Sequence, residues 1–247
     1  MITVDRLYVR YDDTNNILED INLNLPTGIT CAVIGPSGCG KSTLLNILAG
    51  LNKNYQGLVQ INGEKPSPKK QTIGFIPQNY GLLPWLTVKD NILLGLKIKK
   101  EIKQDLPQNL IDTLGLTNLL NRYPNNLSGG QQQRVSLARA FALKADLLLM
   151  DEPFSALDAI TREEMQDVFI DLWQKQKVST VLVTHYVEEA LYLGQKIIVM
   201  TTNPGTIYKI IDNPLFGDKN FRDKEIFYSL SKEIRDYLKK AGKKNER

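Results

Sequence analysis

Nine residues, "GPSGCGKST" (Gly35 to Thr43), constrain the fold of this chain more than any other feature. They follow an apolar run, "GITCAVI", and lead into "KSTLLNILAG", so the segment reads as a strand, a loop and a helix closed by Gly50. In that context the pattern G-x-x-x-x-G-K-[ST] predicts a phosphate loop, in which backbone N–H groups and a helix N-terminus bind an anion. Lys41 would place a positive charge at the β and γ phosphates, and Ser42 would offer a hydroxyl to Mg²⁺.

The loop as a whole supplies the predicted nucleotide contacts. They are Gly35, Pro36, Ser37, Gly38, Cys39, Gly40, Lys41, Ser42 and Thr43. Cys39 fills a variable slot of the pattern, and we expect no redox role for it.

A second segment that carries candidate catalytic residues is "LLLMDEP". Its four apolar residues predict a buried strand, and Asp151 follows at the strand's carboxyl end, where open α/β sheets bind their ligands. We expect Asp151 to reach Mg²⁺ and the adjacent Glu152 to orient or deprotonate the attacking water. The alternative is that the two carboxylates only cap the next helix, but Pro153 and the phosphate loop favour the catalytic interpretation.

Two further polar residues follow predicted strands. His185, the only histidine, ends "STVLVT", and Gln78 follows "TIGFI". A lone histidine is commonly structural, and glutamines at strand ends are common. Because the carboxyl ends of parallel strands share one edge of the sheet, we expect both side chains beside the phosphates, with Gln78 as a metal or water contact.

The stretch "NNLSGGQQQRVSLARA" predicts a second anion-binding helix start. Ser128 and Gln131 have the spacing of a capping box, and Gly129 and Gly130 allow close approach to the helix end. This turn has amides and a helix dipole but no lysine or metal ligand, so it could complete a phosphate site but not make one.

The order of elements predicts an α/β fold with a mainly parallel core sheet. Residues 1–30 read as antiparallel strands, residues from about 88 to 144 as an inserted helical subdomain, and Phe221–Lys240 as a terminal helix. We expect one domain spanning residues 1–247, with a helical extension from about 218 to 247.

Composition excludes several classes of protein. The 247 residues contain no apolar run long enough to span a membrane, no secretory signal pattern, and only two cysteines, which favours a cytosolic address. The net charge of +4 falls in residues 218–247, with 10 Lys or Arg against 6 Asp or Glu. Such a tail could meet nucleic acid or anionic lipid, but interleaved acidic residues favour a solvated helix.

Taken in order, these motifs resemble the nucleotide-binding subunit of an ATP-binding cassette (ABC) transporter, a P-loop NTPase. The resemblance covers essentially the whole chain. It rests on the phosphate loop Gly35–Thr43, the glutamine loop at Gln78, the signature segment Leu127–Gln131, the Walker B strand Leu149–Glu152, the dimer-contact loop Ser155–Asp158 and the switch histidine His185.

The resemblance implies a reason for the second helix start. In this family two cassettes meet head to tail, and the signature helix of one closes on the ATP of the other. Ser128, Gly129, Gly130, Gln131 and Asp158 would then contact the partner or its ATP. The resemblance also implies catalysis by Glu152, His185, Gln78 and Lys41, metal contacts from Ser42, Gln78 and Asp151, and stacking of Tyr11 on adenine, with Tyr8 as a substitute.

Finer features resemble the ATPases of nitrate, sulfonate and taurine importers. They are "LLPWLTV", "ALDAITREEMQ", "NPGTIYKI" and "FRDKEIFYSLSKEI"; Gln131 and Tyr186 depart from that branch, which usually has Met and Asp there. The expected function is ATP hydrolysis, with Mg²⁺, at the cytoplasmic face of the membrane to drive solute uptake. The expected partners are a second copy, a separate permease and, indirectly, a solute-binding protein, with no nucleic acid.

Two alternatives belong to other classes. A cassette acting on nucleic acid or ribosomes would carry two cassettes in tandem or a long coiled-coil insertion, and neither pattern is present. An iron–sulfur assembly ATPase would bind a scaffold protein instead of a permease, and "LLPWLTV" argues against it.

Overall fold

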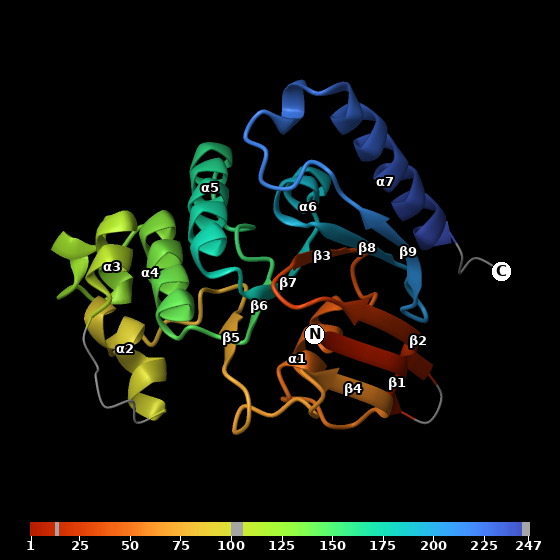
Figure 1. Ribbon diagram of the computed structural model, residues 1–247, viewed down its shortest axis with the longest axis horizontal. Coiled ribbons are helices and arrows are strands. Elements are labelled where there is room, and N and C mark those ends of the chain that lie inside the picture. The colour runs from red at the N-terminus through yellow and green to blue at the C-terminus, as the bar shows by residue number, and fades with distance from the viewer. Residues whose placement is uncertain (13–14, 100–105, 244–247) are drawn as a thin grey trace.

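The computed structural model describes residues 1–12, 15–99 and 106–243, arranged as two sheets with helices around them (Figure 1). The strands are β1 (Ile2–Asp12), β2 (Asn15–Leu25), β3 (Thr30–Ile34), β4 (Gln56–Ile61), β5 (Ile73–Ile76), β6 (Leu147–Asp151), β7 (Ser179–Thr184), β8 (Lys196–Met200) and β9 (Ile207–Asp212). The α-helices are α1 (Lys41–Leu48), α2 (Val88–Ile98), α3 (Gln108–Thr113), α4 (Gly129–Ala142), α5 (Ala159–Gln176), α6 (Val187–Leu193) and α7 (Glu225–Lys243).

The larger sheet has the strand order β5-β6-β7-β3-β8-β9. Its first five strands are parallel, and β9 pairs antiparallel with β8 at the edge. The smaller sheet, β2-β1-β4, is antiparallel throughout. The expected mainly parallel core and antiparallel N-terminal region are therefore confirmed.

Residues of β3 show how the core sheet is covered on both faces. Ala32 and Ile34 pack into one apolar cluster with α4, α5 and α6. Cys31 and Val33 point the other way, into a cluster shared with α1 and the antiparallel sheet. Successive strand side chains face opposite sides, so a strand buried on both faces must be apolar at every position. That requirement explains the uninterrupted apolar run before the phosphate loop.

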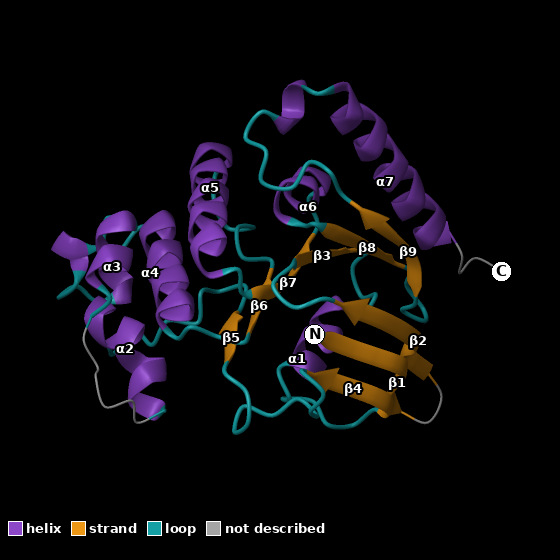
Figure 2. Cartoon of the chain, in the orientation of Figure 1, coloured by secondary structure: helices purple, strands orange, loops and turns teal. Residues whose placement is uncertain are grey.

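Helices α2, α3 and α4 form a group to one side of the sheets, at the left of Figures 1 and 2. Thr87 caps α2 by accepting from the Asp90 N–H. Ser128 caps α4, and both hydrogen bonds of the predicted capping box with Gln131 are present. The elements that the structure describes in residues 88–99 and 106–142 are thus helical, with two short 3₁₀ turns among them.

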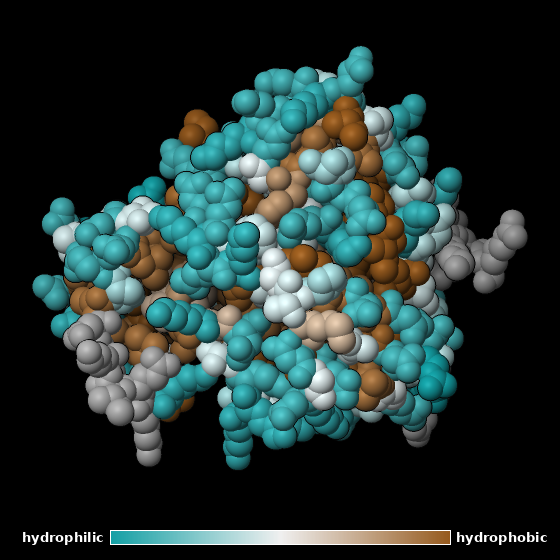
Figure 3. Space-filling view, in the orientation of Figure 1, coloured by the Kyte–Doolittle hydropathy of each residue, from teal (hydrophilic) through white to brown (hydrophobic). Residues whose placement is uncertain are grey.

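The terminal helix begins later than the sequence pattern predicts. Phe221–Asp223 forms a single 3₁₀ turn, and α7 begins at Glu225 because Lys224 is extended, with φ −91° and ψ 136°. One side of α7 packs along β8 and β9, where Figure 3 shows apolar residues gathering. No helix in the described part of the chain is long and apolar enough to cross a lipid bilayer.

Candidate functional site

The phosphate loop, residues 35–43, contains two glycines, Gly35 and Gly40, whose neighbours leave no room for a side chain. Gly40 caps α1 with φ +91°, and a Cβ there would lie 2.4 Å from Leu18 Cδ2. A Cβ on Gly35 would meet the Met200 carbonyl at 2.9 Å. The Lys41 ammonium folds back over this loop and donates to the carbonyls of Gly35 and Pro36 at 2.8 and 2.9 Å. It also donates to Cys39 Sγ at 3.6 Å, so all its partners are loop atoms that an anion could replace.

Ser42 and Asp151 lie next to each other, although Ser42 follows β3 and Asp151 ends β6. Ser42 lies in the first turn of α1, and Asp151 ends β6. Burial raises the pKa of Asp151, while a hydrogen bond with the Ser42 side chain and the charge of Lys41 oppose the shift. A hydroxyl and a carboxylate oxygen side by side suit Mg²⁺. The described residues contain no cluster of three or more His, Cys, Asp or Glu, so an ion here would draw its remaining ligands from phosphate and water.

Gln78, Glu152 and His185 converge at the same edge of the sheet. Glu152 forms an ion-pair contact with His185 Nε2, and Gln78 Nε2 donates to the other Glu152 oxygen at 3.4 Å. The strand order explains this arrangement, because β5, β6 and β7 are neighbours and these residues follow their carboxyl ends. Glu152 itself has φ +48°, a left-handed conformation that is rare for residues other than glycine.

Glu152 and His185 line one open pocket of about 450 Å³, and Gln78 is joined to it through the hydrogen bond to Glu152. Its walls are the phosphate loop from Ser37 to Thr43, together with Glu152, His185 and Ile17. Sequence reasoning missed Ile17, which carries no chemical signal and reaches the loop from β2 only through folding. The sequence-predicted phosphate and catalytic residues are therefore brought together.

The signature residues form a separate cluster. A Cβ on Gly130 would lie 2.8 Å from Thr161 Cγ2, and the Thr161 N–H donates to Asp158 at 3.0 Å. Hydrogen bonds from Thr161 also hold the pKa of the exposed Asp158 below its usual range. Ser128, Gly129, Gly130, Gln131 and Asp158 are not among the described residues that line the phosphate-loop pocket. The α4 and α5 N-termini thus present a second, distinct surface.

Helix α4 also holds the loop that starts at Gln78. Arg139 donates to the carbonyls of Tyr80 and Gly81, and the Ser136 hydroxyl donates to the Tyr80 carbonyl at 2.9 Å. Burial lowers the pKa of Arg139. Sequence reasoning missed this connection; the available signal was a Ser and an Arg three residues apart on an otherwise apolar helix face.

Tyr11 and Cys39 complete the set of predicted nucleotide contacts. Tyr11 lies in β1, but its side chain falls outside the part of the chain that the structure describes. Cys39 is buried, and burial raises the pKa of its thiol, so it stays protonated near neutral pH. That state fits a packing role in the loop.

Comparison with known proteins places this geometry in a family. Residues 18–155 match the family model described as "ABC transporter". The chain is 38% identical over 239 residues to the aliphatic sulfonates import ATP-binding protein SsuB of Bacillus cereus, covering 97% of this chain and 95% of that protein. It is 41% identical to the taurine import ATP-binding protein TauB of Escherichia coli O157:H7, covering 84% and 82%.

A solved structure shares the fold. It is a dimeric, post-hydrolysis ATP-binding cassette bound to ADP and Pi, with a TM-score of 0.75 and 31% identity. The match covers 86% of this chain and 98% of that one.

Proposed function

Because the chain belongs to the ABC transporter family, among importer ATP-binding subunits such as those for sulfonates, taurine and nitrate, we propose how its residues turn ATP hydrolysis into solute uptake. The observation that carries the proposal is that Glu152 and His185 line the pocket of the phosphate loop while Gln78 contacts the Glu152 carboxylate.

The chemistry divides among the residues around the pocket. Lys41 exchanges its carbonyl partners for the β and γ phosphates, and the loop amides bind the remaining phosphate oxygens. Glu152 takes the proton of the attacking water, and His185, in contact with that carboxylate, keeps it oriented toward the γ phosphate. Gln78 contacts the same carboxylate, so a shift of Glu152 also moves the loop that begins at Gln78.

The donor set also fits a magnesium ion. Ser42 and Asp151 would hold it, with Gln78 nearby, and the ion would neutralise charge that develops on the phosphates. Tyr11 is the proposed stacking partner of adenine.

A second copy of the chain completes the site. Ser128 accepts from the Gln131 N–H at 3.3 Å, which leaves its own O–H proton to donate to a phosphate. Since the signature surface lies apart from the pocket of its own chain, its anion-binding amides serve the partner's ATP. Asp158 would contact the partner in the same head-to-tail dimer.

The exposed Trp85 and the half-buried Leu83, together with a groove beside β5 that includes Gly81 of the same loop, form the proposed docking site for a short cytosolic helix of the permease. The groove has a volume of about 310 Å³ and lies between β5, α2 and the end of α4. Its apolar walls include Phe75, Leu94, Ile98 and Leu143, and its floor includes Gly81 of the loop that Arg139 holds. A helix seated there contacts both the loop of Gln78 and the helical group.

The remaining features follow from this assignment. The subunit works at the cytoplasmic face of the membrane, with the solute-binding protein acting through the permease. Residues 1–247 act as one ATPase domain in which about 88–144 form the helical subdomain and about 218–247 the C-terminal extension.

Glu152→Gln tests the proposal. The amide keeps the size of the side chain but removes the base, so ATP binding should persist while steady-state hydrolysis falls at least a hundredfold. The variant should accumulate as an ATP-dependent dimer in size-exclusion chromatography. Near-normal hydrolysis would refute the role of Glu152.

A further inference from the structure

Arg162, in the first turn of α5, holds the loop that precedes its own helix. Its Nε donates to the Phe154 carbonyl at 3.2 Å, and its Nη2 donates to the Leu157 carbonyl at 2.8 Å. The first carbonyl lies directly before the dimer-contact loop, residues 155–158, and the second lies within it. A planar guanidinium that bonds two carbonyls fixes their relative position, which a single point charge cannot do.

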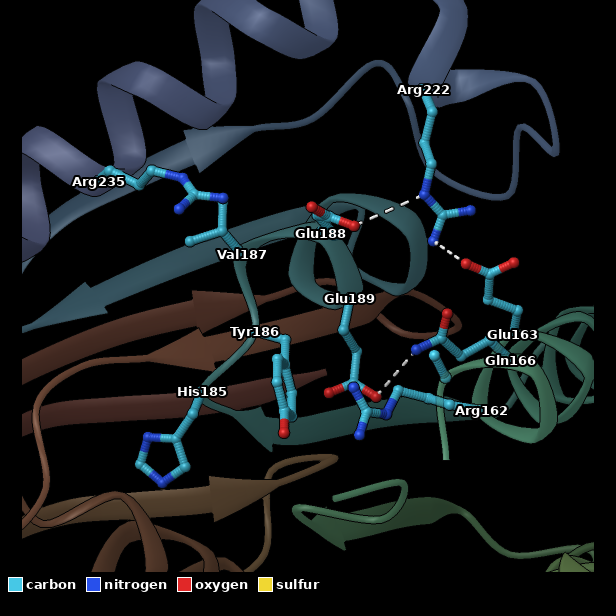
Figure 4. A pocket seen from close by; sticks show the side chains of 11 residues that line it. Arg162, Glu163, Gln166, His185, Tyr186, Val187, Glu188, Glu189, Arg222 and Arg235 are labelled. Atoms are coloured by element: carbon cyan, nitrogen blue, oxygen red, sulfur yellow. Dashed lines mark hydrogen bonds and ion pairs between the residues drawn. The ribbon is translucent and has the colours of Figure 1, made fainter. Parts of the chain in front are cut away.

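The same guanidinium lies over the ring of Tyr186, with Arg162 Cζ 4.2 Å from the ring centroid. Figure 4 shows the two side chains next to each other, Arg162 coming from α5 and Tyr186 from the segment between β7 and α6. The separation is within the range of a cation–π contact. The N–H groups of the guanidinium therefore bond the backbone of the 155–158 loop and the residue before it. Its flat face contacts Tyr186, the residue directly after His185.

The segment that carries His185 is held firmly on its other side. The Thr184 hydroxyl bonds the buried carboxylate of Glu189, and the Tyr186 N–H donates to the Thr184 hydroxyl at 3.0 Å. Gln166, one turn beyond Arg162 on α5, donates to the same Glu189 carboxylate at 3.2 Å. Tyr186 is thus contacted from two sides, at its N–H by Thr184 and at its ring by Arg162.

We propose that Arg162 and Tyr186 are a positioning pair that couples the dimer-contact loop to His185. The inference rests on the proposed function. Movement of Asp158 against a partner subunit displaces the loop carbonyls, Arg162 moves with them, and the Tyr186 ring transmits the shift to the adjacent histidine and its contact with Glu152. Neither residue lines the phosphate-loop pocket, so their effect falls on turnover and not on nucleotide affinity.

The test uses ATP hydrolysis by the full chain, comparing Tyr186→Leu with Tyr186→Phe. No side-chain hydrogen bond of the Tyr186 hydroxyl is recorded in the described structure, so Phe keeps the π face and loses nothing else. We expect Tyr186→Leu to lower kcat about threefold to fivefold and to bring the Hill coefficient for ATP toward one. KM should change by less than twofold, and Tyr186→Phe should restore both kcat and cooperativity.

A double-mutant cycle separates coupling from simple damage. In the Arg162→Ala background, Tyr186→Leu should add no further loss, because the contact is already gone. Arg162→Lys, which keeps the charge but not the two-carbonyl geometry, provides a second background if Arg162→Ala folds poorly. Tyr228→Leu, an exposed aromatic on α7, is the matched control and should behave as wild type in melting temperature and hydrolysis.

Three results would overturn the inference. They are identical kinetics for Tyr186→Leu and Tyr186→Phe, independent losses in the cycle, and a loss in Tyr186→Leu that falls on KM alone. Absence of hydrolysis by the wild-type chain would overturn the proposed function and this inference together, so the two failures are distinguishable.

Discussion

Glu152 connects the chemistry of the site to the backbone of the sheet. Its φ of +48° costs about 1 kcal/mol or more, and its N–H donates to the Val183 carbonyl at 3.0 Å. The neighbouring strand thereby fixes where the carboxylate points, beside His185 and Gln78. The catalytic geometry is built into the strand ends before any nucleotide enters.

Lys41→Ala should weaken nucleotide binding as well as catalysis. The substitution removes a buried charge next to the phosphates, and a hydrogen bond to a charged group contributes about 1.5 kcal/mol or more, so affinity should fall at least tenfold. Titration calorimetry with ATP measures the change. Lys53→Ala, which removes an exposed lysine beyond α1, is the control. Unchanged affinity in Lys41→Ala would show that the ammonium does not contact phosphate.

Glu189→Gln should change how stability depends on pH. Burial raises the pKa of Glu189 to about 7 from its ordinary 4.5, while hydrogen bonds from Thr184 and Gln166 and the charge of Arg162 act in the opposite direction. The nearby charge of Glu152 adds to the rise. The folded protein therefore binds this proton more tightly than the unfolded chain. Its contribution to stability is complete below about pH 4.5 and is lost as the pH rises through about 7.

Urea unfolding between pH 5 and pH 8 measures this effect. At pH 8 the Gln variant should be more stable than wild type by up to about 3 kcal/mol, and the difference should fall to about 1 kcal/mol at pH 5. Glu188→Gln, one residue earlier on α6, should retain the wild-type pH dependence. A constant difference across the range would mean that Glu189 does not titrate there.

At the scale of elements, local sequence patterns predict which polar residues lie at the strand ends. They do not predict which loops the helix side chains contact. The positions of Gln78, Asp151 and His185 follow from strand ends, because neighbouring parallel strands end at one edge. The contacts of Arg139 and Arg162 with loop carbonyls depend on how helices pack, and no local spacing encodes that. The late start of α7 has the same origin, since an extended residue interrupts an otherwise helical pattern.

The loop after Gln78 gives a prediction for the permease interface. Trp85 is 70% exposed, whereas Leu82 packs against the core beside it. We expect Trp85→Ser or Leu83→Ser to weaken co-purification with the permease roughly thirtyfold, since an aromatic anchor contributes about 2 kcal/mol or more. Melting temperature and ATP binding of the isolated subunit should persist.

Tyr228→Ser on α7 is the control for loss of an exposed aromatic. If every substitution in the Trp85 segment lowers the melting temperature sharply, the segment is core and not interface. If the complex forms normally, the permease docks elsewhere.

At the scale of the whole molecule, one chain carries two proposed anion-binding surfaces that do not meet. The phosphate loop opens onto Glu152 and His185, while Ser128 lies at the start of α4 beside Asp158 and Thr161. A head-to-tail pair of chains brings the first surface of each against the second surface of the other. Hydrolysis is therefore expected to require two chains.

Steady-state hydrolysis by a mixture of Lys41→Ala and Ser128→Arg chains tests this claim most directly. Each variant alone should be inactive, the first because it lacks the phosphate lysine and the second because a bulky cation blocks closure. A head-to-tail mixed dimer has one site lacking both functions and one intact site, so mixing should restore part of the wild-type rate. No recovered activity, with mixed dimers demonstrated by differential tagging, would contradict the account.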